Sequence, residues 1–144
     1  MKPALTHIAL AVRDLDRTIA FYRTHCGLHV VHERDEGTRV VWLGEQPTDV
    51  RFVIVLFPAG AGETPGPRSL QHLGFAVGSR AEVDAAAAAA RAEGILRIEP
   101  TYAGPIVGYF CIVEDPDGNG VEFSYGQPID PRQLPDESAK LPLG

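Results

Sequence analysis

The chain has 144 residues, of which 44% are hydrophobic and 22% are charged, and this balance suits a soluble globular protein with one core or two small modules. Its formal net charge of −6 argues against nucleic acid and acidic membrane surfaces as partners, because the protein would repel their phosphates. The sequence contains no apolar run of the roughly 18 residues that a membrane span needs and no secretory signal, so we expect a cytoplasmic protein.

The first strand and helix are predicted from side-chain periodicity. Bulky apolar residues alternate with smaller ones over residues 6–12, which predicts a strand. Apolar residues then recur at helical spacing over 15–26. Asp14 or Asp16 is suited to cap the start of this helix, and Gly27 is suited to end it.

Three more apolar runs, separated by turn residues, predict hairpin-linked strands, so residues 1–57 form a βαβββ module. The predicted strands are 30–33, 39–43 and 51–57. Residues 58–69 are rich in Pro, Gly and Ala and are interpreted as a linker.

The same order of elements follows. Residues 71–77 again alternate, and the alanine run Ala85–Ala90 has high helix propensity, so we expect a helix that opens at Ser79 or Arg80 and stops at Gly94. The small alanine side chains favour close packing of this helix on a sheet.

A second βαβββ module is therefore expected over residues 70–126. Its remaining predicted strands are 96–99, 107–113 and 121–125, with a loop over 100–105. Residues 127–144 contain many prolines and few apolar anchors, and we expect an irregular tail.

The first strands of the two modules share one pattern. In each strand a histidine, His7 or His72, lies with small residues on the face opposite the bulky apolar residues. Such a repeat indicates two like modules, which pack most simply about a pseudo-twofold axis with the two histidines facing each other.

The last predicted strand has a glutamate, Glu122, between apolar residues. Alternation puts Glu122 and Ser124 on one face, while the apolar side chains of 121–125 point to the other. A mid-strand carboxylate must be paired, bound to a metal or facing water. Together with the two histidines, Glu122 favours a site for one divalent metal with open coordination positions, suited to Fe²⁺ or Mn²⁺ and tolerated by Zn²⁺, Ni²⁺ or Co²⁺.

These segments resemble the vicinal oxygen chelate superfamily, which includes glyoxalase, bleomycin-resistance and extradiol-dioxygenase proteins. The resemblance covers roughly residues 4–126 and rests on the two histidine strands, on Arg13–Arg17 and Phe21-Tyr22 after the first strand, and on the Glu122 strand after Asp115–Gly118. It implies an α+β fold in which two tandem βαβββ modules form a half-barrel around a metal cleft. In three-ligand members the metal is held by residues that correspond here to His7, His72 and Glu122.

Differences between this chain and the family patterns reduce the number of reactions that we expect it to catalyse. Glyoxalase I and methylmalonyl-CoA epimerase take a fourth ligand from the last strand of the first module, where this chain has only apolar residues, 52–57. Extradiol dioxygenases need a second-module tyrosine where Ile112 stands, and another histidine besides His72. Fosfomycin-modifying enzymes rely on lysine, which occurs here only as Lys2 and Lys140.

We therefore expect a metal-dependent, glyoxalase-like lyase or isomerase that acts on a small oxygenated metabolite, with Glu122 as ligand and proton shuttle. An extradiol-like dioxygenase and a bleomycin-resistance-type drug-binding protein remain the alternatives. The residues expected to line the substrate cleft are Trp42, Tyr102, Tyr109 and Ser124. The remaining histidines, His25, His29 and His32, are expected at the surface or at a helix end.

Two further expectations concern assembly and the thiols. A βαβββ module exposes an open sheet edge, so we expect a homodimer whose modules pair either within one chain or by exchange with the partner. Cys26 and Cys111 lack a CxxC spacing and are expected to be reduced thiols, without a disulfide or a zinc ion.

Overall fold

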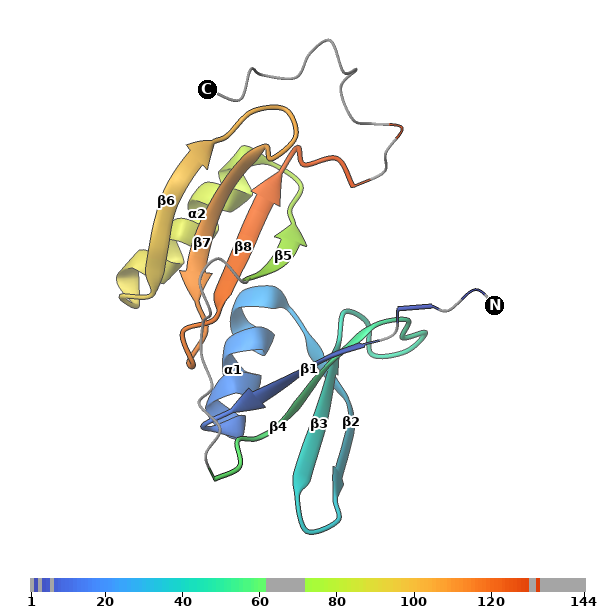
Figure 1. Cartoon of the computed structure of the whole chain (residues 1–144). Coiled ribbons are helices and arrows are strands. Elements are labelled where there is room, and N and C mark those ends of the chain that lie inside the picture. The colour runs from blue at the N-terminus through green and yellow to red at the C-terminus, as the bar shows by residue number, and fades with distance from the viewer. Residues whose placement is uncertain (1, 3, 6, 62–71, 130–131, 133–144) are drawn as a thin grey trace. The chain divides into compact units, whose positions relative to one another are not determined.

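The computed structural model describes residues 2, 4–5, 7–61, 72–129 and 132 (Figure 1). These residues divide into two compact units. Unit 1 comprises Met1–Gln71 and Asp115–Asn119, and unit 2 comprises His72–Glu114 and Gly120–Gly144. Most of the expected linker, 62–69, and most of the expected tail, 130–131 and 133–144, lie outside the described residues. No helix in the described ranges is long and apolar enough to cross a membrane.

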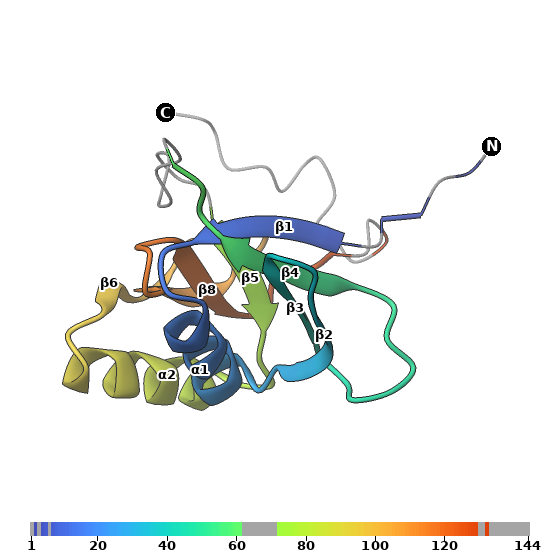
Figure 2. The ribbon, with the colours of Figure 1, turned by 90° about the horizontal axis from the view of Figure 1, so that it is seen from below.

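Unit 1 is a four-stranded sheet with one helix. Its elements are β1 (His7–Val12), α1 (Leu15–Cys26), β2 (His29–Asp35), β3 (Arg39–Gly44) and β4 (Val53–Pro58). The strand order is β1-β4-β3-β2, in which β1 runs parallel to β4 and the other neighbours are antiparallel. Figure 2 shows α1 on one side of this sheet.

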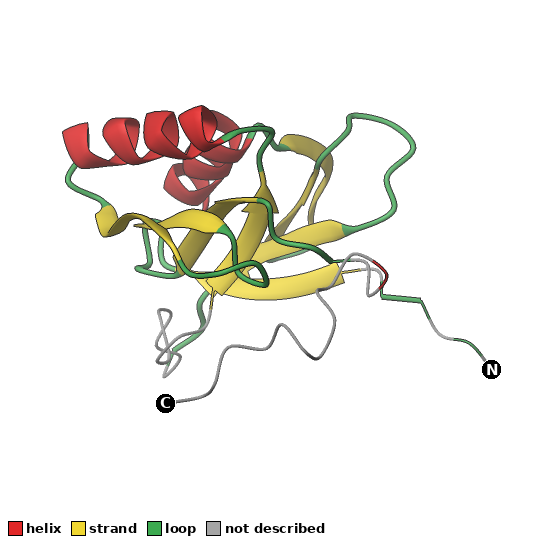
Figure 3. Ribbon diagram, turned by 90° about the horizontal axis from the view of Figure 1, so that it is seen from above, coloured by secondary structure: helices red, strands yellow, loops and turns green. Residues whose placement is uncertain are grey.

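Unit 2 repeats this topology. Its elements are β5 (His72–Ala76), α2 (Arg80–Ala92), β6 (Leu96–Tyr102), β7 (Tyr109–Glu114) and β8 (Gly120–Tyr125). The strand order is β5-β8-β7-β6, again with the first pair parallel. Figure 3 shows helices and strands in separate colours. The predicted α+β fold of two tandem βαβββ modules is confirmed.

The helix ends follow the predicted capping residues. The Asp14 side chain accepts a hydrogen bond from the Arg17 backbone N–H at 2.9 Å, and Gly27 ends α1 in the left-handed conformation, with φ of 66°. Ser79 caps α2 in the same manner, and Gly94 follows its end with φ of 72°. The expected boundaries of both helices are therefore confirmed to within about two residues.

Each core lies between the helix and one face of its sheet. In unit 1 the buried residues of α1 include Ile19 and Tyr22, and those of the sheet include Val41, Leu43 and Leu56. In unit 2 the fully buried Ala87 and Ala90 confirm that α2 packs closely. Among the described residues, the opposite face of each sheet carries no helix of its own unit.

The largest difference from a predicted boundary is at the end of β6. The sequence predicts a strand that stops at Glu99 and a loop over 100–105, whereas β6 continues through Pro100 to Tyr102. The strand tolerates proline because β6 is the outer strand of its sheet, and its register with β7 shifts at two places.

A buried hydrogen-bond cluster ties Asp115–Asn119 into unit 1. The hydroxyl of the fully buried Tyr22 donates to Asp115 Oδ2 at 2.9 Å, and the Asp115 carboxylate also accepts from both the backbone and the side chain of Asn119. Burial, and then the neighbouring Asp115 carboxylate, raise the pKa of Tyr22 above its ordinary value, so the hydroxyl remains a donor. Asp117 accepts from the Arg13 backbone and guanidinium, each at 3.1 Å.

We predict that Tyr22→Phe destabilises the protein by about 1–3 kcal/mol, because the buried Asp115 carboxylate loses a donor without gaining water. The matched control is Tyr125→Phe, which removes a hydroxyl from a side chain that is 42% exposed and should change stability by less than about 0.5 kcal/mol. Urea unfolding of the three proteins measures the difference. Equal stability of Tyr22→Phe and the parent would contradict the role of this hydrogen bond.

Candidate metal centre and the pocket of unit 1

Adjacent strands of unit 2 bring His72 and Glu122 together. In the parallel pairing of β5 with β8, Gly74 is opposite Glu122 and His72 is opposite Gly120. His72, Gly74 and Glu122 therefore share one face, because side chains two residues apart on a strand point the same way. The neighbouring Val121 and Phe123 point to the other face and are buried.

The separation of the two side chains suits a shared metal ion. His72 Nε2 lies 3.5 Å from Glu122 Oε2. This exceeds the usual 2.7–3.2 Å of an N–H···O hydrogen bond, but two ligands that bind one tetrahedral ion at about 2.1 Å lie roughly 3.4 Å apart. The His72 side chain is 40% exposed and that of Glu122 only 8%. An imidazole and a largely buried carboxylate at this spacing fit a divalent metal.

Gly74 leaves room beside this pair. A Cβ placed on Gly74 would meet no atom within 4 Å, so the space over the strand opposite Glu122 is open. Ser124 lies on the same face but is buried, and its hydroxyl is 3.5 Å from Gln127 Oε1. Open space next to Glu122 is what a metal-bound small molecule would require.

The third expected ligand, His7, belongs to unit 1. It is exposed on β1, on the face away from α1. Within the described ranges, no three His, Cys, Asp or Glu side chains converge as a complete metal site. Unit 2 thus supplies two of the expected ligands as a close pair, and unit 1 carries the third.

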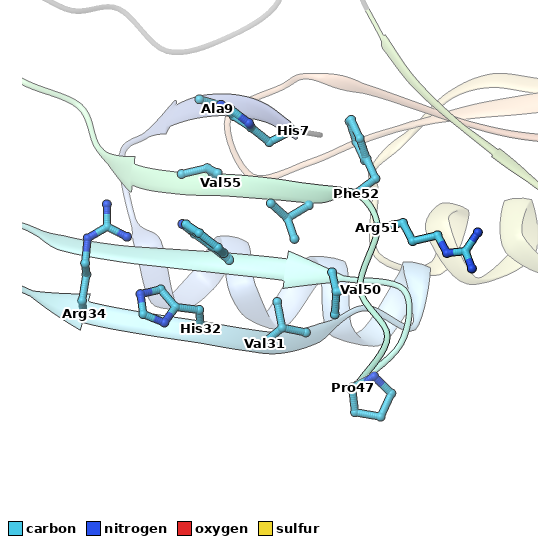
Figure 4. Close-up of a pocket in the computed structure, with 12 residues that line it drawn as sticks. His7, Ala9, Val31, His32, Arg34, Pro47, Val50, Arg51, Phe52 and Val55 are labelled. Atoms are coloured by element: carbon cyan, nitrogen blue, oxygen red, sulfur yellow. The ribbon is translucent and has the colours of Figure 1, made fainter. Parts of the chain in front are cut away.

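His7 lies at the edge of a pocket in unit 1 of about 700 Å³. The side chains that form it come from all four strands and from the segment before β4 (Figure 4). Strand register aligns Ala9, Val55, Trp42 and His32 in one row across the sheet. Trp42 therefore lines this pocket, and its contact with a substrate stays a prediction.

Tyr102 and Tyr109, which were also expected to line the substrate cleft, lie on the helix-covered side of unit 2. Register pairs Tyr102 with Tyr109 and Tyr109 with Tyr125, which puts them on the face of unit 2 opposite to Glu122. Arg80 of α2 lies over both rings, with its Cζ 5.3 Å and 5.0 Å from their centroids, and Tyr109 Oη donates to Asp84. These contacts hold the two tyrosines on the helix side, so neither belongs to the candidate site.

Sequence reasoning missed His32 and Arg34. Both line the pocket of unit 1, although His32 was expected to be a plain surface residue. The His32 ring lies 4.8 Å from that of Trp42, and Arg34 Cζ lies 5.9 Å from the Trp42 ring centroid. The available signal was the alternation of basic and acidic residues over 32–35, which sorts the two charges onto opposite faces of β2.

The two cysteines are unsuited to nucleophilic chemistry. Cys26 is half-buried and Cys111 is buried, and both are free cysteines in the structure. Burial raises the pKa of the Cys111 thiol to about 11 and that of Cys26 to about 12, so neither is a thiolate at neutral pH.

Comparison with known proteins establishes the family. Residues 4–123 match the model of the Glyoxalase/Bleomycin resistance protein/Dioxygenase superfamily. The chain belongs to this superfamily. The protein PA2024 of Pseudomonas aeruginosa is 47% identical over 132 residues, which cover 91% of this chain and 94% of PA2024. The predicted family resemblance is confirmed.

Solved structures of the superfamily share the fold. The lactoylglutathione lyase of Agrobacterium tumefaciens is 28% identical, with a TM-score of 0.59, over 87% of this chain and 95% of the lyase. A variant of the fosfomycin resistance protein FosX from Listeria monocytogenes, complexed with Mn(II) and 1S,2S-dihydroxypropylphosphonic acid, is 19% identical, with a TM-score of 0.68, over 90% and 94% of the two chains. The second likeness concerns the fold alone.

We predict that Gly74→Val folds with unchanged or slightly higher stability, because its side chain enters open space and valine favours strands. The contrasting variant is Gly108→Val. At Gly108 φ is 79°, and a Cβ would clash with the Tyr125 carbonyl oxygen. We therefore expect the free energy of unfolding to fall by at least about 1–3 kcal/mol. Urea unfolding compares the two. If Gly74→Val lost as much stability as Gly108→Val, the space beside Glu122 would not be open.

Proposed function

We propose that the protein is a divalent-metal-dependent, glyoxalase-like lyase or isomerase whose small substrate binds the metal through adjacent oxygens. The observation that carries the proposal is the 3.5 Å approach of His72 Nε2 to the nearly buried Glu122 Oε2, on a sheet face with open space at Gly74. Membership of a superfamily with lyase members supports the same reaction class.

In this proposal His7, His72 and Glu122 hold one metal ion. The bound ion would act as a Lewis acid and stabilise negative charge on a substrate oxygen. His72 contributes a neutral imidazole nitrogen, and its remaining ring nitrogen is left to orient the ring. Three protein ligands leave coordination positions for the two oxygens of the substrate.

Glu122 has a second proposed role as proton shuttle. Its Oε2 faces His72, so Oε1 is the atom that we assign to accept and return a proton. Because the side chain is only 8% exposed, little water competes with the substrate there, and charge interactions are stronger than at the surface. The mid-strand position keeps the carboxylate fixed, which favours repeated transfer at one place.

We predict that the purified protein retains about one divalent metal ion per chain and that His72→Ala and Glu122→Ala each lower this content at least tenfold, since one lost ligand typically costs more than a kcal/mol of binding energy. His29→Ala, at an exposed position at the start of β2, is the matched control and should retain the metal. Elemental analysis after dialysis measures all of these proteins.

Retention of the metal by both ligand variants would contradict the assigned ligands. A parent protein that takes up no divalent metal would instead favour the alternative of a drug-binding protein that needs none.

We also predict that chelation of the metal leaves the fold intact, because both cores lie on the helix-covered faces of the sheets while the proposed ligands lie on the opposite faces. Far-UV circular dichroism and a thermal melt, with and without chelator, test this. Cooperative loss of the spectrum on chelation would identify a structural metal in place of a catalytic one.

A further inference from the structure

The pocket-facing side of β2 carries an arginine, Arg34, in a protein of net negative charge. Alternation along β2 directs His32 and Arg34 into the pocket of unit 1, and it directs Glu33 and Asp35 to the other face. Glu33 forms an ion pair with Arg39, and Asp35 accepts from the Gly37 backbone N–H at 3.1 Å. The acidic side chains of this strand are therefore engaged away from the pocket.

The lining of the pocket contains no Asp or Glu among the described residues. Arg51 also lies on its lining, but its guanidinium is 4.0 Å from the Asp49 carboxylate, and both side chains are nearly fully exposed. In the described parts of the chain, Arg34 has no carboxylate within ion-pair distance, and the contact that the structure gives it is with the Trp42 ring. Arg34 is thus the cation that the pocket offers to a ligand.

Trp42 supplies an apolar surface next to this cation. It is half-buried in the middle of the sheet, between Val55 on one neighbouring strand and His32 on the other. The row continues to Ala9 on β1, so small and apolar side chains extend from Trp42 toward the strand of His7. A flat apolar group has room to lie on this row, with a charged group at Arg34.

We propose that this pocket selects small carboxylates with a flat apolar or aromatic body, the body lying on Trp42 and the carboxylate contacting the Arg34 guanidinium. This inference rests on the proposed function, because the small carboxylates are the substrate class that we assign to the proposed metal-dependent enzyme. Strand spacing puts the Cα positions of His7 and Trp42 about 12 Å apart, so a substrate that reaches both is larger than a three-carbon metabolite.

Trp42 is the only tryptophan of the chain, so its fluorescence reports on this pocket alone. The probes are 3-phenylpropanoate, 3-phenylpropanamide and 3-phenylpropylammonium, which share one phenyl body and differ in charge. We expect saturable binding of the carboxylate, binding of the amide that is weaker by roughly fivefold, as for a partly exposed ion pair, and weaker binding still of the ammonium compound.

Arg34→Gln should abolish the preference for the carboxylate, and Arg34→Lys should retain part of it. Arg91→Gln is the matched control, because Arg91 lies in unit 2, outside the lining of the pocket, where it is paired with Glu99, and it should leave the preference unchanged. Absence of saturable binding of the carboxylate, equal affinity for the amide, or an unaltered preference in Arg34→Gln would each overturn the proposal.

The titrations are made on chelator-treated protein, so their outcome does not depend on a metal. A preference for the carboxylate in a protein that binds no metal would leave the pocket assignment standing and refute the proposed metal centre. Retention of the metal in a protein that shows no preference for the carboxylate would refute the pocket assignment and leave the proposed metal centre standing.

Discussion

The single helix of each module covers only one face of a four-stranded sheet, and most features of this protein follow from that constraint. Bulky apolar residues such as Leu43 and Leu56 in unit 1, and Val121 in unit 2, occupy the covered faces and form the cores. Because strand side chains alternate, the other faces carry the polar and small side chains, among them His7, His72, Gly74 and Glu122, together with apolar ones such as Trp42 and Val55. The proposed ligands and the pocket of unit 1 lie on these helix-free faces.

Glu122 is the side chain on which the functional interpretation depends. A carboxylate buried in a sheet between Val121 and Phe123 is costly unless a cation or donor compensates it. In the structure its partner is His72 at 3.5 Å, across the parallel pairing of β5 and β8. That spacing suits two ligands of one ion better than a direct hydrogen bond, and this is the physical basis of the proposed metal centre.

The features that could be predicted from the sequence are those set by residues close together in the chain, namely the helix ends and the faces of the strands. Asp14, Ser79, Gly27 and Gly94 fix the helix ends through capping, and alternation alone assigned His72 and Glu122 to matching faces. It did not predict features that depend on register. The face of Tyr109 follows from its pairing with Tyr125, the extension of β6 follows from its position at the sheet edge, and His32 joins Trp42 beyond an irregularity in the β2–β3 register. The Tyr22–Asp115 hydrogen bond joins residues that no sequence period relates. The domain boundaries, the homodimer and the third ligand remain predictions.

A crystal structure of the protein grown with Mn²⁺, with anomalous diffraction recorded to locate the ion, decides between a metal centre and a hydrogen-bonded pair. We expect one anomalous peak within coordination distance of a ring nitrogen of His7, a ring nitrogen of His72 and a carboxylate oxygen of Glu122, with no fourth protein ligand. A peak bound by other residues, or no peak together with a direct His72–Glu122 hydrogen bond, would contradict it.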